Sequence, residues 1–319
     1  MTTDLLRQRL YGAMSALVTP FRDGDVNLAS LARLAEWQIG EGINGLVPCG
    51  TTGEAPTLSW HERIAVIRTC VAVSAGRVPV IAGTGSNGTD ATIAFTAAAR
   101  DFGADAALIV TPYYNRPTQA GIVRHFEAIA AKVDIPIVVY NVPARTGVDL
   151  TPAIIARLAD IPTIVGFKDA TGDLPRQMAL SRQFGSRFVS LSGHDATAFG
   201  FNTMGGSGTI SVVANVVPRL CVDMHDACRS GDTHAARAIQ QRLRPLIDAL
   251  ERETNPVPVK FALHAMGKIA PDVRLPLVEV EPDTAVAIGN ALSGFAPQPR
   301  MCTPHPARSA TALVRRPNS

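Results

Sequence analysis

Eight short apolar runs recur along the chain, each bounded by Gly, Pro or polar residues. Runs that are apolar at every position are typical of strands buried on both faces, and therefore of a parallel sheet covered by helices. The eight predicted strands are Met14–Pro20, Gly45–Cys49, Val78–Gly83, Ala106–Thr111, Ile135–Tyr140, Thr163–Phe167, Phe188–Leu191 and Gly208–Val212.

Stretches with the helical period of 3.6 residues separate these strands. Ser59 followed by Glu62 forms a capping-box pattern, and Thr151-Pro152 is a second helix start. A strand-helix alternation with a period of roughly thirty residues fits a closed (β/α)8 TIM barrel, which leaves no sheet edge. The predicted helices of this part are Leu28–Glu41, Ser59–Ala75, Thr89–Phe102, Gln119–Lys132 and Pro152–Ala159.

One motif favours an open doubly wound sheet instead. Gly83–Gly88 matches G-x-G-x-x-G and lies between a strand and a helix. In a dinucleotide-binding sheet this motif belongs to the first strand-helix unit, and an acidic residue ends the next strand. Here it follows the third predicted strand, and Asp105 precedes the next strand rather than ending it. We therefore predict the barrel.

After the eighth strand the pattern becomes entirely helical. We predict a barrel over residues 1–225 and a C-terminal helical extension over 226–296, which acts as an assembly surface or as a cap. Residues 297–319 lack an apolar period and are predicted to be a disordered tail. The predicted helices of this part are Val216–Arg229, Thr233–Arg252, Val257–Met266 and Pro282–Leu292.

The net charge of +3 comes from the tail, because 297–319 contains four arginines and no acidic residue, which leaves −1 on the remainder. We therefore expect neither nucleic acid nor membrane as a partner. The chain has no apolar run of membrane-spanning length and no signal-like N-terminus, which predicts a cytoplasmic protein. Its five cysteines never form a C-x-x-C pair, so reduced thiols are expected.

The strongest candidate for chemistry is Lys168, at the end of the sixth predicted strand. Strand ends of a parallel barrel form its active-site face. Lys168 is one of only four lysines in the chain, and it follows an apolar strand. Burial disfavours a charged amine, so a neutral nucleophile becomes available near pH 7. The competing interpretation is a structural lysine that pairs with its neighbour Asp169.

Other polar residues also follow predicted strands. Tyr140, on the neighbouring strand, can give and take the proton that imine formation requires, although such a tyrosine is often only packed. Gly50–Glu54 offers two hydroxyls and backbone amides to a small carboxylate, with glycines for close approach and positive φ, or is simply a tight turn. The guanidinium of Arg145 can donate two parallel hydrogen bonds, which suits a second carboxylate.

Metal chemistry is not indicated. The seven histidines never pair at i, i+4, and H-E-x-x-H is absent. His194-Asp195 is the one candidate near the strand ends, and we expect it to form hydrogen bonds rather than bind a metal. A serine nucleophile elbow is also absent.

Taken together, these motifs resemble the dihydrodipicolinate synthase family, within the N-acetylneuraminate lyase superfamily of pyruvate-dependent class I aldolases. The resemblance runs from about Tyr11 to Ala296. The motifs that carry it are Gly50–Glu54, Thr111–Asn115, Tyr140–Gly147, Gly166–Gly172, Leu191–Gly193 and Asn255–Lys260.

The resemblance implies a role for each site residue. Lys168 would form an imine with pyruvate, and Thr52, Tyr140 and Tyr114 would relay protons, the last from a neighbouring subunit. Thr51 and Thr52 would bind the carboxylate of pyruvate, and Arg145 would bind the carboxylate of L-aspartate 4-semialdehyde. The carbonyl of Ile210 would line the pocket, and Gly193 would bind substrate.

The reaction that the resemblance implies is the synthesis of 4-hydroxy-tetrahydrodipicolinate on the route to lysine and diaminopimelate. No cofactor or metal would be needed, and a homo-oligomer, a tetramer or a dimer, is expected. The alternative is an aldolase or dehydratase for 2-keto-3-deoxy sugar acids, although such relatives usually lack an arginine at the position of Arg145. A catalytically silent ligand sensor is the third possibility, against which Lys168, Tyr140 and Thr52 argue.

The resemblance also bears on regulation. Lysine-inhibited members carry His and Glu at positions that resemble Trp60, Arg63 and Ala91, while Asn87 and Tyr113 are retained. We therefore predict weak or absent feedback by lysine.

Overall fold

The computed structural model describes residues 3–295 of the 319-residue chain. Eight parallel strands form one sheet in the order β4-β1-β10-β9-β8-β7-β6-β5. A parallel bridge between Leu46 and Val80 joins the two ends of that order, so the sheet closes. The predicted (β/α)8 barrel is confirmed. Its strands are β1 (Gly12–Ser15), β4 (Gly45–Leu46), β5 (Ile81–Gly83), β6 (Ala106–Val110), β7 (Ile137–Asn141), β8 (Ile164–Asp169), β9 (Val189–Ser192) and β10 (Gly208–Ser211).

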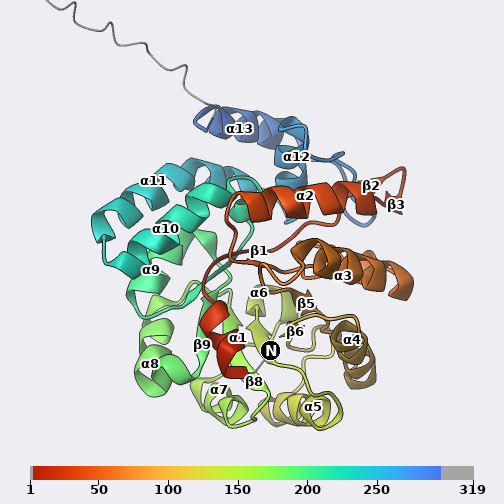
Figure 1. The fold of residues 1–319 in the computed structure, drawn as a ribbon, viewed down its shortest axis with the longest axis vertical. Coiled ribbons are helices and arrows are strands. Elements are labelled where there is room, and N and C mark those ends of the chain that lie inside the picture. The colour runs from red at the N-terminus through yellow and green to blue at the C-terminus, as the bar shows by residue number, and fades with distance from the viewer. Residues whose placement is uncertain (1–2, 296–319) are drawn as a thin grey trace, which may run out of the picture.

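Helices surround the barrel as an outer ring (Figure 1). The capping box is present, since Ser59 Oγ accepts from Glu62 N while Glu62 accepts from Ser59 N, and Thr151 caps its helix. These helices are α2 (Leu28–Gly40), α3 (Trp60–Ser74), α4 (Thr89–Asp101), α5 (Gln119–Lys132), α7 (Pro152–Ala159), α8 (Leu174–Phe184), α9 (Ala198–Thr203) and α10 (Pro218–Ser230).

Three further helices lie together on one side of the barrel, at the top of Figure 1. They are α11 (Thr233–Leu250), α12 (Val257–Ala265) and α13 (Pro282–Ser293). The predicted helical extension is therefore present. The boundary near residue 225 stays a prediction, because α10 passes through it and contacts both β1 and α11. The predicted tail, 297–319, lies outside the described residues.

Several elements were not predicted. Helix α1 (Thr3–Arg9) and the residue after it bury Leu6 and Leu10 in the cluster that fills the barrel, together with Val138 and Val165. The other unpredicted elements are α8, α9, the hairpin β2 (Phe21–Arg22) and β3 (Asp25–Val26), α6 (Pro143–Thr146), and the short 3-10 turns η1 (Ala55–Thr57), η2 (Gly185–Arg187), η3 (Asp195–Thr197) and η4 (Val213–Asn215).

The first predicted strand was placed too late. It was expected at Met14–Pro20, but β1 ends at Ser15, where its register with β10 ends at Ser211. An apolar run that continues past the ladder cannot be divided by hydrophobicity alone, because strand and buried loop are equally apolar.

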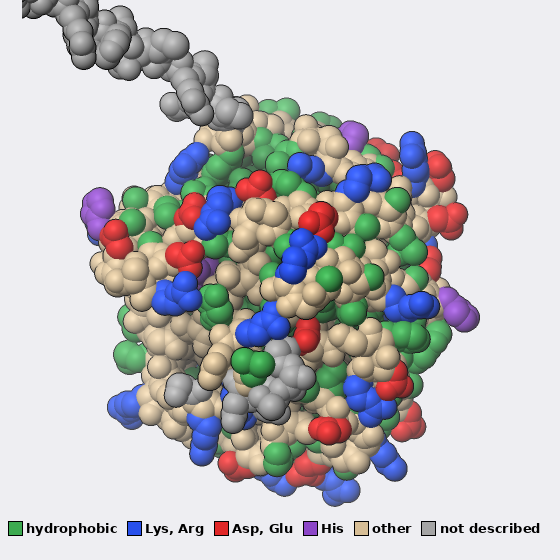
Figure 2. All heavy atoms as spheres, viewed as in Figure 1, with side chains coloured by type: hydrophobic (Ala, Val, Ile, Leu, Met, Phe, Trp, Pro, Cys, Tyr) green, Lys and Arg blue, Asp and Glu red, His purple; other side chains and the backbone are tan. Residues whose placement is uncertain are grey.

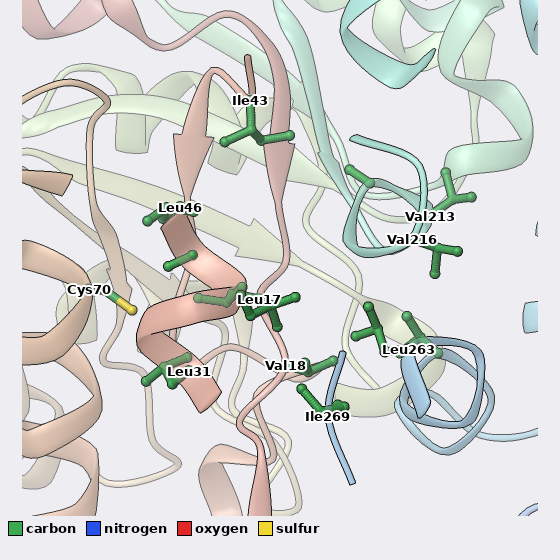
Figure 3. Close-up of a cluster of buried hydrophobic side chains, with 14 of the residues drawn as sticks. Leu17, Val18, Leu31, Ile43, Leu46, Cys70, Val213, Val216, Leu263 and Ile269 are labelled. Atoms are coloured by element: carbon green, nitrogen blue, oxygen red, sulfur yellow. The ribbon is translucent and has the colours of Figure 1, made fainter. Parts of the chain in front are cut away.

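The core lies on both sides of the sheet. One cluster fills the barrel, and two others lie between strands and helices. In the larger outer cluster, Leu17 and Leu31 lie near Leu46, and Leu263 lies toward Val213 and Val216 (Figure 3). This packing fixes the C-terminal helices against the same barrel whose strand ends carry the predicted site.

Basic and acidic side chains are interspersed on the face shown in Figure 2. None of the helices within residues 3–295 combines the length and the apolar character needed to cross a membrane.

We expect two buried histidines to make folding sensitive to acid. Burial lowers the pKa of His225 to about 3 and that of His125 to about 4. Both folded pKa values lie below the unfolded value, so this stability is present above about pH 6.5 and is lost as the pH falls toward the folded values. Each histidine should remove about 2 kcal/mol from the free energy of unfolding between about pH 6.5 and 5.

Urea unfolding of the wild type and of His225→Asn at both pH values measures this loss. We expect His225→Asn to lose less stability on acidification. The exposed His61 provides the matched control His61→Gln, which should lose as much as the wild type. An acid loss of the same size in all three proteins would contradict the assignment to His225.

Candidate active site

Lys168 and Tyr140 lie side by side inside the barrel. They are register partners on β8 and β7. Lys168 Nζ lies 4.1 Å from the centroid of the Tyr140 ring, and the lysine is only 6% exposed. A Cβ added at Gly193 would lie 2.8 Å from Lys168 Cε, so glycine is required there for the lysine to occupy its place. The structure thus brings three of the predicted site residues together.

Asp169, which could have paired with Lys168, points the other way. Successive side chains of a strand face opposite sides of the sheet, and Asp169 lies on the outer side of β8. Its carboxylate accepts hydrogen bonds from Asn141 Nδ2 (3.1 Å) and Thr171 Oγ1 (2.9 Å). Burial raises the pKa of Asp169, and these hydrogen bonds oppose that rise. The lysine is therefore not held by its neighbour.

The Thr51–Thr52 turn leaves backbone donors free. Within residues 3–295, neither the Thr51 nor the Thr52 amide N–H donates a hydrogen bond, whereas Gly53 N donates to Gly50 O. Gly53 serves the predicted close approach, since a Cβ there would lie 3.0 Å from Cys49 N. The predicted positive φ belongs instead to two non-glycine residues, Cys49 and Glu54. The turn is thus built to present unpaired N–H groups.

Asn255 connects Thr52 with Arg145. Its Nδ2 donates to Thr52 Oγ1 at 2.9 Å, and its backbone carbonyl accepts from Arg145 Nη2 at 3.3 Å. Asn255 comes from the segment between α11 and α12. The C-terminal extension therefore contributes directly to the site.

A cavity of about 310 Å³ opens at the strand ends. Thr51, Tyr140 and Arg145 line it, as do Asn255 and Leu277. A mostly apolar cavity with a few polar groups is the usual form of a small-molecule site. Lys168 and Thr52 are buried and are not among the residues that line the cavity.

Two predicted residues have different surroundings. Ile210 is buried in the cluster that fills the barrel, together with Tyr140 and Leu191. Tyr114, by contrast, is 90% exposed with a φ of 69°, and it lies outside the group that the single chain assembles. Its exposure fits a side chain that acts in a neighbouring subunit, which stays a prediction.

A buried ion pair between Lys260 and Glu54 stabilises the end of the Gly50–Glu54 turn. Lys260 Nζ donates to Glu54 Oε1 at 2.5 Å and to the carbonyl of Asp272 at 2.7 Å, and Arg274 N donates to Glu54 Oε2. Both side chains are at most 1% exposed. Burial lowers the pKa of Lys260 to about 8, while Glu54 opposes that shift. The pair fixes the end of the turn that begins at Gly50.

Asn255, Lys260 and Asn141 were not predicted from the sequence to have a role in the site. Asn255 and Lys260 lie in a family motif, but their partners Thr52 and Glu54 are about two hundred residues away in the chain. The scarcity of lysine in the chain was a further signal for Lys260.

The remaining motifs have structural roles. A Cβ at Gly83 would lie 2.1 Å from Cys49 O, and one at Gly85 would lie 2.6 Å from Val110 N, so these glycines permit close packing of strand ends. Asp195 accepts from the backbone amides of Val212 and Val213, which confirms its hydrogen-bonding role. No group of three potential ligand side chains that could hold a metal occurs within residues 3–295.

Comparisons with known proteins agree with this geometry. The model of the dihydrodipicolinate synthetase family matches residues 9–294. The 4-hydroxy-tetrahydrodipicolinate synthases of Ruegeria pomeroyi and Rhodospirillum centenum are each 53% identical, over 88% and 84% of this chain and 97% and 92% of their own lengths.

A solved structure agrees as well. The structure of the chloride-inhibited dihydrodipicolinate synthase from Acinetobacter baumannii complexed with pyruvate has a TM-score of 0.88 and 45% identity, over 89% of this chain and 98% of its own. The family model spans most of the chain, and the fold and the motif residues agree with it. This chain belongs to the dihydrodipicolinate synthetase family.

Proposed function

We propose that this protein is a lyase that condenses pyruvate with L-aspartate 4-semialdehyde to give 4-hydroxy-tetrahydrodipicolinate and water, in lysine and diaminopimelate biosynthesis. Relatives that are 53% identical over most of the chain carry the name of this activity. The observation that carries the chemistry is the amine of Lys168, held inside the barrel 4.1 Å from the Tyr140 ring.

The proposed reaction begins when Lys168 Nζ attacks the keto carbon of pyruvate and water leaves, forming an imine. The protonated imine withdraws electrons, so the methyl group loses a proton and an enamine forms. The enamine carbon attacks the aldehyde carbon, whose oxygen takes a proton and becomes the hydroxyl. The amine of the second substrate then attacks the imine carbon, closes the ring and releases Lys168.

The other site residues have supporting roles in this proposal. Thr51 and Thr52 hold the pyruvate carboxylate, which is supported by their unpaired amide N–H groups. Thr52 and Tyr140 relay protons together with Tyr114 from a neighbouring subunit. Further substrate contacts come from Arg145 at the cavity mouth, the carbonyl of Ile210 and the backbone of Gly193.

We further propose that the protein works as a homo-oligomer, a tetramer or a dimer, in the cytoplasm, without a cofactor or metal. The exposed Tyr114 supports the oligomer, because a large aromatic side chain that is 90% exposed on a positive-φ backbone is available to a neighbouring subunit.

An assay with both aldehyde classes tests the substrate. With pyruvate present, we expect turnover of L-aspartate 4-semialdehyde at a kcat/KM at least about 100-fold above that for D-glyceraldehyde. The Arg145 guanidinium favours an aldehyde that carries a carboxylate. A preference for glyceraldehyde would favour the sugar-acid aldolase instead.

Tyr140→Phe should lower kcat about 10²- to 10³-fold, because the phenol is removed from the proton relay while the ring beside Lys168 remains. Steady-state rates measure kcat, and the thermal midpoint checks the fold. Tyr11→Phe is the matched control outside the site and should leave kcat unchanged. Wild-type turnover by Tyr140→Phe would remove Tyr140 from the relay.

L-Lysine should inhibit weakly or not at all. The guanidinium of Arg63 lies 3.9 Å from the Phe95 ring centroid, and Trp60 stacks on the same ring at 4.8 Å. Arg63 is thus a buried cation at one of the positions where lysine-inhibited members carry His or Glu, and it repels the amino groups of free L-lysine. Initial rates over a series of lysine concentrations measure the effect. Substantial inhibition at low lysine concentration would contradict the prediction.

A further inference from the structure

A buried polar group lies directly behind Lys168 and Tyr140. Each of the two residues is followed in its strand by a polar residue, Asp169 after Lys168 and Asn141 after Tyr140, and these two are also register partners. Side chains alternate along a strand, so the pair that faces the barrel is backed by a pair on the outer side. Asn141 is 0% exposed and Asp169 is 4% exposed.

Asn141 is fully engaged at its buried position. Its Nδ2 donates to Asp169 Oδ1 at 3.1 Å and to Asp149 Oδ1 at 2.8 Å, and its Oδ1 accepts from Leu150 N at 3.2 Å. The amide therefore joins the ends of β7 and β8 to the loop before α7. An aspartate could not replace it without losing both donated bonds.

The charges around Asn141 explain why a neutral donor is needed there. Asp149 and Asp169 face the guanidinium of Arg176, which pairs with Asp149 Oδ2 at 2.5 Å and lies 3.7 Å from both Asp169 Oδ2 and Asp173 Oδ2. Arg176 lowers the pKa of Asp149. The Asn141 amide lies between the two carboxylates and donates to both.

The backbone carbonyls of Asn141 and Asp169 also accept hydrogen bonds from residues that surround the site. Ala170 N donates to Asn141 O at 3.0 Å, and Gly193 N donates to Asp169 O at 2.7 Å. Gly193 is the residue whose missing Cβ leaves room for Lys168. A shift at Asp169 would therefore move Lys168 and the wall against which it packs.

From these contacts we propose that Asn141 and Asp169 are positioning residues: their hydrogen bond holds the ends of β7 and β8 so that Lys168 meets Tyr140 and the keto carbon in reactive geometry. This inference rests on the proposed imine at Lys168. Neither residue touches substrate in this account. They act through the strands that carry Lys168 and Tyr140.

The rate of imine formation tests this role. Enzyme is mixed with saturating pyruvate, samples are reduced with borohydride at successive times, and intact mass gives the fraction with an adduct. Asn141→Asp keeps the shape of the side chain but adds a further carboxylate to the group around Arg176. It should slow trapping at least about tenfold, since small displacements of reacting groups have large effects on rate.

The conservative variants separate positioning from charge and from general damage. Asp169→Asn can still accept from Asn141 and should trap within about threefold of the wild type. The exchanged pair, Asn141→Asp with Asp169→Asn, restores one donor and one acceptor and should trap faster than Asn141→Asp alone.

A matched structural control comes from the neighbouring strand. Ser190 on β9 is the register partner of Phe167, and its hydroxyl donates to buried Gln177 Oε1 at 2.5 Å. Ser190→Ala removes a buried hydrogen bond one layer below the site, so it should lower the thermal midpoint yet trap at the wild-type rate.

The outcomes are distinct. Slow trapping by folded Asn141→Asp, partly restored in the exchanged pair, supports the role. Trapping by Asn141→Asp at the wild-type rate, or rates that simply follow the thermal midpoints of all variants including Ser190→Ala, would overturn it. No adduct in the wild type would instead remove the proposed function itself.

Discussion

Lys168→Ala is expected to lower kcat by about 10⁴-fold or more while the fold remains intact. The proposed covalent intermediate cannot form without the amine, and no other described lysine is placed to replace it, since Lys260 is committed to Glu54. Steady-state turnover with pyruvate and L-aspartate 4-semialdehyde measures the loss.

Two controls belong to this experiment. Lys168→Arg keeps a positive charge but provides no nucleophile, so it should be as inactive as Lys168→Ala. Lys132→Ala removes an exposed lysine at the end of α5 and should leave kcat unchanged. Activity of Lys168→Arg near the wild-type level would show that charge rather than covalent chemistry is required.

Lys260→Met is expected to be the most destabilising of the substitutions considered. It leaves the Glu54 carboxylate buried without a cation, which costs about 3 to 5 kcal/mol. Because Glu54 ends the threonine turn, the KM for pyruvate should also rise. Chemical denaturation measures the free energy of unfolding, and steady-state rates give KM.

A double substitution distinguishes the loss of the Lys260–Glu54 ion pair from the loss of packing around Lys260. Glu54→Gln combined with Lys260→Met removes both charges, and the amide oxygen of the introduced glutamine can still accept from Arg274 N. We expect the double variant to recover most of the lost stability, since two neutral groups of similar shape replace a buried ion pair. A double variant as unstable as Lys260→Met would mean that packing around Lys260, rather than an unpaired carboxylate, sets the loss.

The barrel could be predicted from sequence because its strongest signals are local. Continuous apolar strands and capped helices repeat, and Gln119–Lys132 and Pro152–Ala159 match the observed helices at both ends. Helix α1 was missed because its role comes from packing Leu6 and Leu10 against strands far along the chain. Seven residues are too few to establish a helical period.

The site residues show the same contrast between local signals, which the sequence reveals, and contacts between distant residues, which it does not. Lys168 and Tyr140 were predictable because each lies at the end of an apolar run of the sequence, one residue before the end of its strand, and strands β7 and β8 are consecutive. Asn255 and Lys260 were not assigned, because a hydrogen bond between residues about two hundred positions apart leaves no periodic pattern. The positive φ expected at the glycines of the Gly50–Glu54 turn was wrong, since Cys49 and Glu54 adopt it under the constraint of their surroundings.

The central claim is that the amine of Lys168 forms an imine with pyruvate. Reduction with borohydride in the presence of pyruvate, followed by digestion and mass spectrometry, tests it most directly. The predicted result is one reduced pyruvate adduct, located on Lys168 and absent from Lys168→Ala. An unmodified Lys168, or an adduct of equal yield in Lys168→Ala, would contradict the account.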